Sequence, residues 1–339
     1  MSIQPAATSK KEKGDSLLDL TLRPQQWNEY IGQERLKKNL KILIEAAKKR
    51  GDALEHVLLS GPAGLGKTSM AYLIAREMNT NIRVTSGPAI ERVGDLASIL
   101  TNLLPQDILF IDEAHRLNKL IEEVLYPAME SRTLDIVIGK GPSARIIQIE
   151  LPPFTLIAAT TRTGLLSSPL RSRFGGAFRL DFYSEEEIGK IITRSAKILG
   201  VNIKEEAVER LARSARFTPR AANRLLKRAR DFAQISEKAS IDDEIVRKTL
   251  ELLEIDDSGL ESMDRRILEI IIKKFGGGPV GLSALAAASA EEEDTIEEVY
   301  EPYLMQLGFI ERTPRGRMAT ENAYRHLGFA VTQQKSLLS

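Results

Sequence analysis

The hydrophobic positions between residues 56 and 182 form short continuous runs, and longer amphipathic stretches separate them. Continuous apolar strands that alternate with helices are typical of a parallel sheet covered by helices on both faces. The pattern therefore predicts an α/β domain over residues 1–183. Its five expected strands are His56–Ser60, Ile82–Thr85, Ile108–Asp112, Thr155–Thr160 and Phe178–Phe182.

One segment interrupts this alternation. Residues 133–151 hold two β-rich runs joined by Lys140-Gly141-Pro142-Ser143, which predicts a hairpin inserted before the fourth strand. On the second run, Ile147 and Ile149 alternate with Gln148, so their side chains share one face. On an exposed hairpin this face would be a contact patch for a partner. The same side chains could instead pack on their own domain, and the alternation does not decide between the two.

Beyond residue 183 the pattern changes to that of amphipathic helices. Residues 184–256 predict three helices, each preceded by an N-cap residue. These helices open at Ser184, at Thr218-Pro219 and at Ser240 with Asp243, and they end near Gly200, Ile235 and Glu254.

Residues 257–339 combine three expected helices with two short strands, which is the winged-helix pattern. A type I turn with Pro at its second position and Gly at its fourth separates the strands. Three domains are therefore predicted, over residues 1–183, 184–256 and 257–339. The elements of the third are helices Ser262–Phe275, Leu282–Ser289 and Thr295–Leu307, and strands Phe309–Thr313 and Arg317–Thr320.

The run Gly61-Pro62-Ala63-Gly64-Leu65-Gly66-Lys67-Thr68 matches the P-loop pattern. It follows an expected strand and opens an expected helix, which is the context that a P-loop requires. Its glycines let backbone N–H groups wrap phosphates at the positive end of the helix dipole. Lys67 would reach the β- and γ-phosphates and Thr68 would ligate Mg²⁺. The predicted cofactors are therefore ATP/ADP and Mg²⁺.

A buried strand, Ile108–Asp112, delivers Asp112 and Glu113 to its carboxyl end, where ligands bind in open α/β sheets. Asp112 would hold Mg²⁺ and Glu113 would orient the attacking water. Thr161 follows the fourth strand and could sense the γ-phosphate, or the hydroxyls there could simply terminate the strand. Asp112-Glu113-Ala114-His115 also spells DEAH. A helicase of that name needs a second parallel-sheet lobe, which nothing after residue 184 supplies.

Two arginines, Arg171 and Arg173, precede the fifth strand. Either could be an arginine finger, which stabilises phosphoryl-transfer charge in a neighbouring subunit. Either could also form a structural ion pair, and the spacing alone does not decide.

Together these motifs resemble the AAA+ ATPases and, among them, the RuvB family of bacterial Holliday-junction branch-migration motors. The resemblance runs from about Leu22 to Gly328. It implies an α/β P-loop core, an all-helical lid and a C-terminal winged helix. Further segments that carry it are Tyr30-Ile31-Gly32-Gln33, Thr85-Ser86-Gly87-Pro88, Ala159-Thr160-Thr161-Arg162, Ser168–Gly175, Thr218-Pro219-Arg220 and Tyr300-Glu301-Pro302-Tyr303-Leu304.

The resemblance implies a role for each matched residue. Arg173 would be the finger acting in trans, and Arg220 the sensor arginine of the lid. Catalytic roles then fall to Lys67, Asp112, Glu113, Thr161, Arg173 and Arg220. Metal binding falls to Thr68 and Asp112. Nucleotide contacts fall to Leu22, Arg23, Gly64, Gly66, Lys67, Thr68, Ser69, Glu130, Ser131, Arg132, Arg173, Tyr183 and Arg220.

The charge distribution singles out the expected wing. The whole chain carries 48 basic and 47 acidic residues, but residues 257–339 carry 9 and 13. Arg312, Arg315 and Arg317 are therefore a basic cluster in an acidic domain. Phosphate contacts there would bind DNA without reading its sequence, as the family's DNA contacts imply. The alternative is a solvated basic turn.

The resemblance also implies partners. These are double-stranded DNA at Holliday junctions, RuvA docked on the 133–151 hairpin through Ile147 and Ile149, RuvC in a resolvasome, and further copies in a homohexamer that acts in recombination and repair. No apolar run is long enough to span a bilayer and the N-terminus lacks an apolar signal segment, so no membrane is expected. The expected location is the cytoplasm.

Two other functions remain as alternatives. A clamp-loader-like AAA+ protein would carry a Ser-Arg-Cys finger motif, whereas this chain has Ser172-Arg173-Phe174 and no cysteine. A nucleotide-switched DNA-binding scaffold would not need the water-orienting Glu113. Departures from the family pattern at Ala63, Ala114, Ala158 and Phe217 remove no catalytic group, although Phe217 alters the expected hinge of the lid.

Overall fold

The computed structural model describes residues 20–138 and 145–330. The chain divides into two compact units, with the boundary between Tyr183 and Ser184. No helix in the described ranges is long and apolar enough to cross a membrane.

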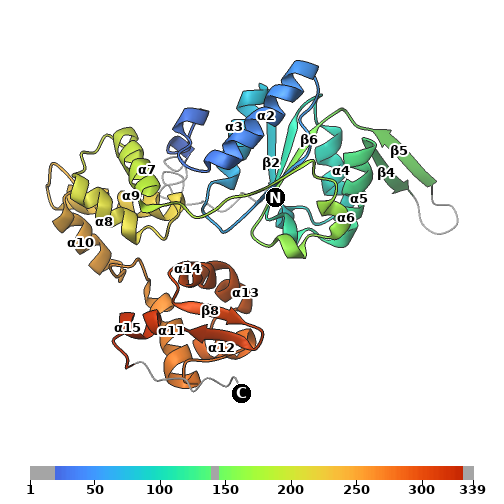
Figure 1. The fold of residues 1–339 in the computed structure, drawn as a ribbon. Helices are drawn as coiled ribbons and strands as arrows, with labels where there is room; N and C mark the ends of the chain where they lie inside the picture. Colours follow the sequence, from blue (N-terminus) through green and yellow to red (C-terminus); the bar gives the residue numbers. More distant parts are fainter. Residues whose placement is uncertain (1–19, 139–144, 331–339) are drawn as a thin grey trace, which may run out of the picture. The chain divides into compact units, whose positions relative to one another are not determined.

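The first unit is built around a five-stranded, all-parallel sheet with the strand order β2-β3-β6-β1-β7 (Figure 1). The central strand β6 is buried at all six positions, as the continuous apolar run predicts for a strand covered on both faces. The strands are β1 (Val57–Ser60), β2 (Ile82–Ser86), β3 (Ile108–Asp112), β6 (Thr155–Thr160) and β7 (Gly176–Arg179).

Helices cover both faces of this sheet (Figure 1). Alternate strand residues such as Leu58, Leu109 and Leu156 form one buried cluster with side chains of α4, α5 and α6. Helices α2 and α3 lie on the other face. The helices are α2 (Glu34–Arg50), α3 (Lys67–Met78), α4 (Val93–Thr101), α5 (Lys119–Glu130) and α6 (Ser168–Arg171), with short 3₁₀ turns η1 (Trp27–Glu29), η2 (Gly87–Ala89), η3 (Ala114–Arg116) and η5 (Thr163–Leu165).

The fifth strand begins earlier than the sequence predicts. It covers Gly176–Arg179 and not Phe178–Phe182, because Gly176 already donates a backbone hydrogen bond to His56 (3.2 Å). A Cβ at Gly176 would lie 2.7 Å from the ring of Phe178. A larger residue here would therefore require the Phe178 ring to shift, and glycine is a residue that strand propensity disfavours.

The predicted hairpin is present as β4 (Thr133–Ile138) and β5 (Arg145–Glu150), paired antiparallel. Its expected turn at Lys140–Ser143 lies outside the described residues. Ile149 pairs with the fully buried Leu134 and packs against the core of the first unit. Ile147, two residues earlier, is 47 % exposed.

The second unit begins with four helices that pack on one another. Two of them start where their capping residues predict, after Ser184 and Thr218. The last is capped by Asp242 and not by Ser240, because the Asp242 carboxylate accepts a hydrogen bond from the Ile245 N–H (3.0 Å). The second helix was not predicted. The four are α7 (Glu185–Ile198), α8 (Glu205–Ser214), α9 (Pro219–Ile235) and α10 (Asp243–Leu252).

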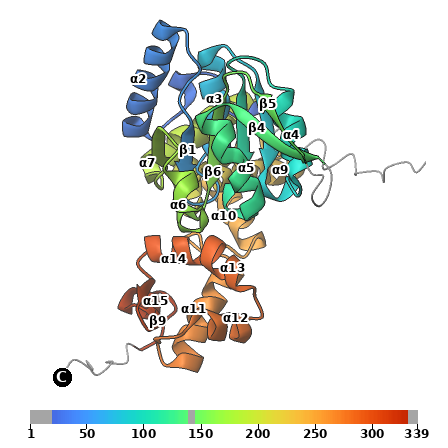
Figure 2. The ribbon, with the colours of Figure 1, turned by 90° about the vertical axis from the view of Figure 1, so that its right-hand side faces the viewer.

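The rest of the second unit is a winged helix (Figure 2). Helices α11 (Ser262–Phe275) and α12 (Leu282–Ser289) have the predicted bounds. The third helical segment starts at Glu293, two residues earlier than predicted, and contains a π turn. It comprises α13 (Glu293–Thr295), η6 (Ile296–Tyr300) and α14 (Glu301–Gln306); the wing is β8 (Ile310–Thr313) and β9 (Gly316–Ala319), followed by an unpredicted α15 (Glu321–His326).

Candidate functional site

The P-loop joins β1 to α3 at the carboxyl edge of the parallel sheet. Gly64 (φ 83°) and Gly66 (φ 97°) adopt left-handed conformations that side chains disfavour. A Cβ at Gly66 would also lie 2.8 Å from the Tyr30 hydroxyl. The loop therefore has the tightly curved backbone that surrounds a chain of phosphates at the start of a helix. These residues fit a nucleoside triphosphate.

Lys67 folds back over this loop. Its side chain is buried, and its Nζ donates hydrogen bonds to the carbonyls of Gly61 (2.7 Å) and Pro62 (2.8 Å). These contacts hold the ammonium group inside the curve of the loop, where phosphate oxygens would be stronger acceptors than carbonyls.

The expected magnesium ligands lie side by side. The Thr68 hydroxyl donates to Asp112 Oδ2 at 3.2 Å, although 44 residues separate them. Both are hard oxygen donors of the kind that Mg²⁺ takes together with nucleotide phosphates and waters. No cluster of three or more His, Cys, Asp or Glu side chains suited to a metal occurs in the described parts of the chain. An ion here would therefore depend on Thr68, Asp112 and the bound phosphates.

Glu113 stands at a sharp turn after β3. Its backbone is left-handed (φ 48°), and its N–H donates to Asp112 Oδ1 (3.0 Å). The carboxylate is half exposed and 3.4 Å from Arg116. Because the side chain is half exposed, its carboxylate is accessible to water.

The neighbouring strand β6 ends at the same edge. The Thr160 hydroxyl is fully buried, lies 3.1 Å from His115 Nδ1 and accepts a hydrogen bond from the Arg162 N–H (3.0 Å). Thr161, the expected sensor, follows directly and is half-buried. His115 had no assigned role in the sequence, yet it joins the turn after β3 to the end of β6.

Two tyrosines bind the backbone of the P-loop. Tyr183 and Tyr30 both donate to the Leu65 carbonyl, at 3.1 and 3.3 Å. Burial, together with the neighbouring Tyr183, raises the pKa of Tyr30 well above its ordinary value. Leu22 is buried in the same unit, and the Arg23 guanidinium lies 5.3 Å from the centre of the Tyr72 ring.

Apart from Ser69, in the first turn of α3, the remaining predicted nucleotide contacts of this unit lie at the opposite edge of the sheet. Arg173 is three residues before β7, and it forms an ion pair with Glu130 at the end of α5 (3.1 Å). The preceding Met129 carbonyl is 3.1 Å from the His56 ring, just before β1 begins. Ser131 and Arg132 follow Glu130. Since β1, which ends at the P-loop, and β7, which follows Arg173, each have four residues and span about 13 Å at about 3.3 Å per residue, Glu130–Arg132 and Arg173 are a strand length from the P-loop of their own subunit.

Arg220 belongs to the second unit, in the first turn of α9, and is exposed. The two residues before its N-cap Thr218, Arg216 and Phe217, are both left-handed (φ 53°). Such conformations cost about 1–2 kcal/mol for a residue with a side chain. Contacts offset that cost, because Arg216 donates to the buried Asp264 of α11 (2.7 Å) and Phe217 packs against Tyr303.

The three wing arginines have different environments. Arg312 and Arg317 each donate two hydrogen bonds to Glu301 of α14, at 2.9 Å and 3.1 Å respectively. Arg312 also pairs with Glu297 (3.2 Å). Glu301 is 1 % exposed, Arg317 12 % and Arg312 46 %. Arg315, at the turn, is exposed and makes no ion pair within residues 20–138 and 145–330.

Sequence reasoning missed Glu301. Its burial alone would raise the pKa of the carboxyl group, but the hydrogen bonds from Arg312 and Arg317 outweigh burial and hold that pKa below its ordinary value. Its position between Tyr300 and Pro302 gave no sign that two wing arginines meet there. The charge pattern revealed the cluster but not its counter-ion.

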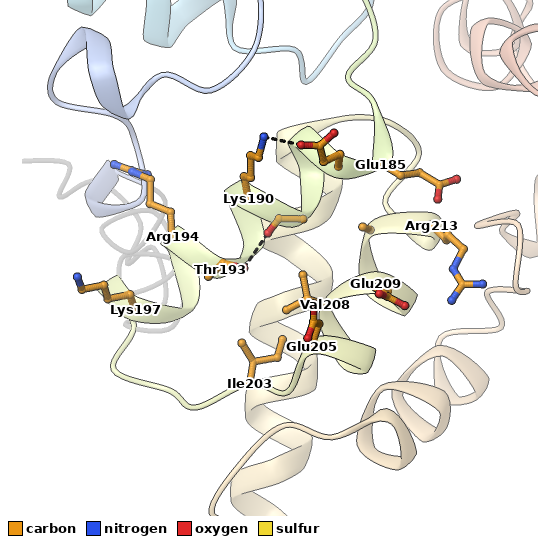
Figure 3. A pocket seen from close by; sticks show the side chains of 13 residues that line it. Glu185, Lys190, Thr193, Arg194, Lys197, Ile203, Glu205, Val208, Glu209 and Arg213 are labelled. Atoms are coloured by element: carbon orange, nitrogen blue, oxygen red, sulfur yellow. Dashed lines mark hydrogen bonds and ion pairs between the residues drawn. The ribbon is translucent and has the colours of Figure 1, made fainter.

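The second unit also contains an open groove of about 1100 Å³ between α7 and α8 (Figure 3). Its lining combines apolar side chains such as Ile203 and Val208 with charged ones such as Lys190 and Glu209. None of the residues predicted from the sequence lines this groove.

Comparison with known families accounts for the three segments in order. The protein-family model described as "Holliday junction DNA helicase RuvB P-loop domain" matches residues 22–180. The RuvB AAA lid domain matches residues 183–256, and the RuvB C-terminal winged helix domain residues 257–328. The chain belongs to the RuvB family. Members of this AAA+ family are P-loop ATPases, so nucleotide binding and ATP hydrolysis follow for the chain.

Individual RuvB proteins are similar over nearly the whole length. The Holliday junction branch migration complex subunit RuvB of Dehalococcoides mccartyi (strain CBDB1) is 59 % identical over 322 residues, covering 95 % of this chain and 92 % of the relative. The solved Thermotoga maritima RuvB Holliday junction branch migration motor is 53 % identical with a TM-score of 0.85, covering 92 % and 100 %. A point mutant of that protein gives 0.86 at the same identity.

Proposed function

We propose that this chain is an ATP-driven, ring-forming DNA motor that moves Holliday junctions together with RuvA during recombination and repair. One observation supports it most strongly. The P-loop, Asp112 and Glu113 lie at the carboxyl edge of the sheet, whereas Arg173 lies at the amino edge. A finger in that position is out of reach of its own nucleotide and needs a second copy beside it.

In this mechanism each group has a separate task. Lys67 and the backbone N–H groups of the P-loop bind the phosphates, and Thr68 with Asp112 would hold Mg²⁺. The ion, when bound, neutralises charge on the phosphate oxygens. Glu113 orients the attacking water. Arg173 of the adjacent copy stabilises the charge that develops on the transferred phosphoryl group, with Glu130–Arg132 beside it, and Thr161 senses the γ-phosphate.

The lid and the winged helix would convert this cycle into movement. Arg220 opens α9 and would meet the γ-phosphate, so that hydrolysis changes the position of the lid. The wing arginines Arg312, Arg315 and Arg317 would contact DNA phosphates. We further propose a cytoplasmic homohexamer that docks RuvA through the exposed Ile147, with Ile149 supporting the hairpin from the core side, and that works beside RuvC.

A branch-migration assay on a synthetic four-way junction tests the proposal. We expect ATP-dependent conversion of the junction into duplex products, faster with RuvA present, and none with Lys67→Ala, which lacks the phosphate-binding ammonium. If the chain hydrolyses ATP and binds the junction but never moves it with RuvA present, the motor is excluded and the nucleotide-switched scaffold is favoured.

A further inference from the structure

The Arg173 guanidinium is held by three groups of its own subunit. Its Nη2 lies 3.1 Å from the Glu130 carboxylate, and its Nη1 donates to the Pro169 carbonyl at 2.6 Å. Its Cζ lies 4.6 Å from the centre of the Tyr126 ring. Its Nε is covered and makes no hydrogen bond with the described residues. The cation is therefore fixed in place without having all its donors satisfied.

Tyr126 is itself firmly oriented. It lies on α5 one turn before Glu130, so both side chains share one face of the helix. Its ring packs against the core of the first unit. Its hydroxyl lies 2.8 Å from the Ser167 hydroxyl, and Ser167 caps the short helix α6 that carries Pro169. The ring, the carboxylate and the carbonyl thus belong to one connected frame.

The three contacts differ in how easily a phosphate could replace them. Glu130 is 60 % exposed, and exposed ion pairs contribute only about 0–1 kcal/mol. A phosphate oxygen would therefore compete with it readily. The guanidinium instead lies over the face of the Tyr126 ring, and this cation–π contact occupies none of the N–H donors. The ring can hold the cation while those donors turn to a phosphate.

We propose that Tyr126 is a positioning residue for the finger Arg173, and that Glu130 is a counter-ion that is displaced when the triphosphate of a second copy arrives. This rests on the proposed role of Arg173 in trans. The ring fixes the position of the guanidinium before the second copy docks, so the cation is already in place when phosphoryl charge develops.

Steady-state ATP hydrolysis by the full-length protein tests this with Tyr126→Leu and Tyr126→Phe. The Leu variant lacks the ring face, and we expect kcat to fall about three- to thirty-fold, the range of a cation–π contact converted to a rate, with KM within twofold. The Phe variant keeps the ring and loses only the hydroxyl, so its kcat should stay within twofold. Glu123→Ala, exposed on the same helix and without a contact to Arg173, is the matched control.

A double-mutant cycle separates positioning from a general structural effect. In an Arg173→Ala background, Tyr126→Leu should lower single-turnover hydrolysis no further. An equal loss in both backgrounds would overturn the inference, as would equal losses in the Phe and Leu variants. If the Leu variant unfolds, Tyr126→Met, of similar size and without a ring, replaces it. If Arg173→Ala itself hydrolyses ATP at the normal rate, the proposed role of Arg173 as a finger is wrong. That result differs from one in which Arg173 is essential but Tyr126 does not position it.

Discussion

Two groups of arginines carry the functional predictions, and their surroundings are opposite. In the first unit, Arg173 is held by the exposed Glu130, a ring face and a carbonyl. In the second unit, Arg312 and Arg317 share one carboxylate, Glu301, that is almost completely buried. Both are ion pairs of ordinary length, so distance alone does not distinguish them.

The difference teaches which cation can change partner. Exchanging the exposed Glu130 for a phosphate costs little, because water already solvates that carboxylate. Removing Arg317 from Glu301 would take two hydrogen bonds away from a buried charge, and breaking a buried ion pair costs several kcal/mol. Arg173 is therefore available for a transient contact. Arg317, in contrast, is tied to the buried Glu301 of α14, so any contact it makes with DNA would have to keep this pair, whereas the half-exposed Arg312 and the exposed Arg315 face solvent.

The largest expected effect separates the two arginines before β7. Arg173→Ala should lower kcat for ATP hydrolysis by about a thousandfold or more, the range for an arginine finger, while nucleotide binding stays within a few-fold. Arg171→Ala is the matched control, since Arg171 is exposed two residues away. Normal turnover in Arg173→Ala, or a loss in Arg171→Ala alone, would contradict the assignment.

A stability difference should follow for the two carboxylates. Glu301→Ala leaves two arginines against a buried site and should destabilise the second unit by about 3–5 kcal/mol. Glu130→Ala should cost the first unit no more than about 1 kcal/mol. The single tryptophan, Trp27, lies in the first unit, so urea unfolding followed by fluorescence and by ellipticity resolves both. Equal losses of unfolding free energy in the two variants would show that burial does not determine how much each carboxylate contributes to stability.

The wing arginines should also differ in their effects on DNA binding and stability, according to whether they are exposed or paired with the buried Glu301. Arg315→Ala removes one free cation, so the slope of log Kd against log salt should decrease by about 0.9, with unchanged stability. Arg317→Ala should also weaken DNA binding but should in addition lower the stability of the second unit, because it breaks the ion pair with the buried Glu301. Binding isotherms on duplex DNA at several salt concentrations, with a parallel urea titration, measure both. An unchanged slope in Arg315→Ala would remove it from the interface.

The smallest effect concerns pH. The pKa of Glu301 is lowered in the fold, so the stability it contributes is present above its ordinary value of about 4.3 and is lost as pH falls through the folded pKa. Burial raises the pKa of Asp264, despite Arg216, so its ionisation costs stability as pH rises above about 3.9.

Relative to the parent chain, Glu301→Gln should therefore lose stability as pH rises from about 3 to 5, and Asp264→Asn should gain it. Urea midpoints of the second unit over this range check both signs. The same sign in both variants would show that the two buried carboxylates are not distinguished by their arginines.

The sequence predicts local features well and distant pairings poorly. Capping residues place α7 and α9, and the P-loop spacing predicts that Lys67 and Thr68 open α3, because these signals act within one helical turn. The predicted start of β7 was wrong because Gly176 and Ala177 already pair with β1, although strand propensity disfavours both residues. The partners Glu301 and Tyr126 were missed because only the tertiary fold brings them to Arg317 and Arg173. The spacing of Arg171 and Arg173 also did not decide which of the two is the finger.

The central claim is that one ATP site needs two copies of the chain. Mixing Lys67→Ala, which has an intact finger, with Arg173→Ala, which has an intact P-loop, tests it most directly. Each variant alone should be almost inactive, and the mixture should regain hydrolysis at interfaces that combine the intact P-loop of one copy with the intact finger of the other. Hydrolysis by the mixture no higher than the sum of its separate components would contradict a finger that acts in trans.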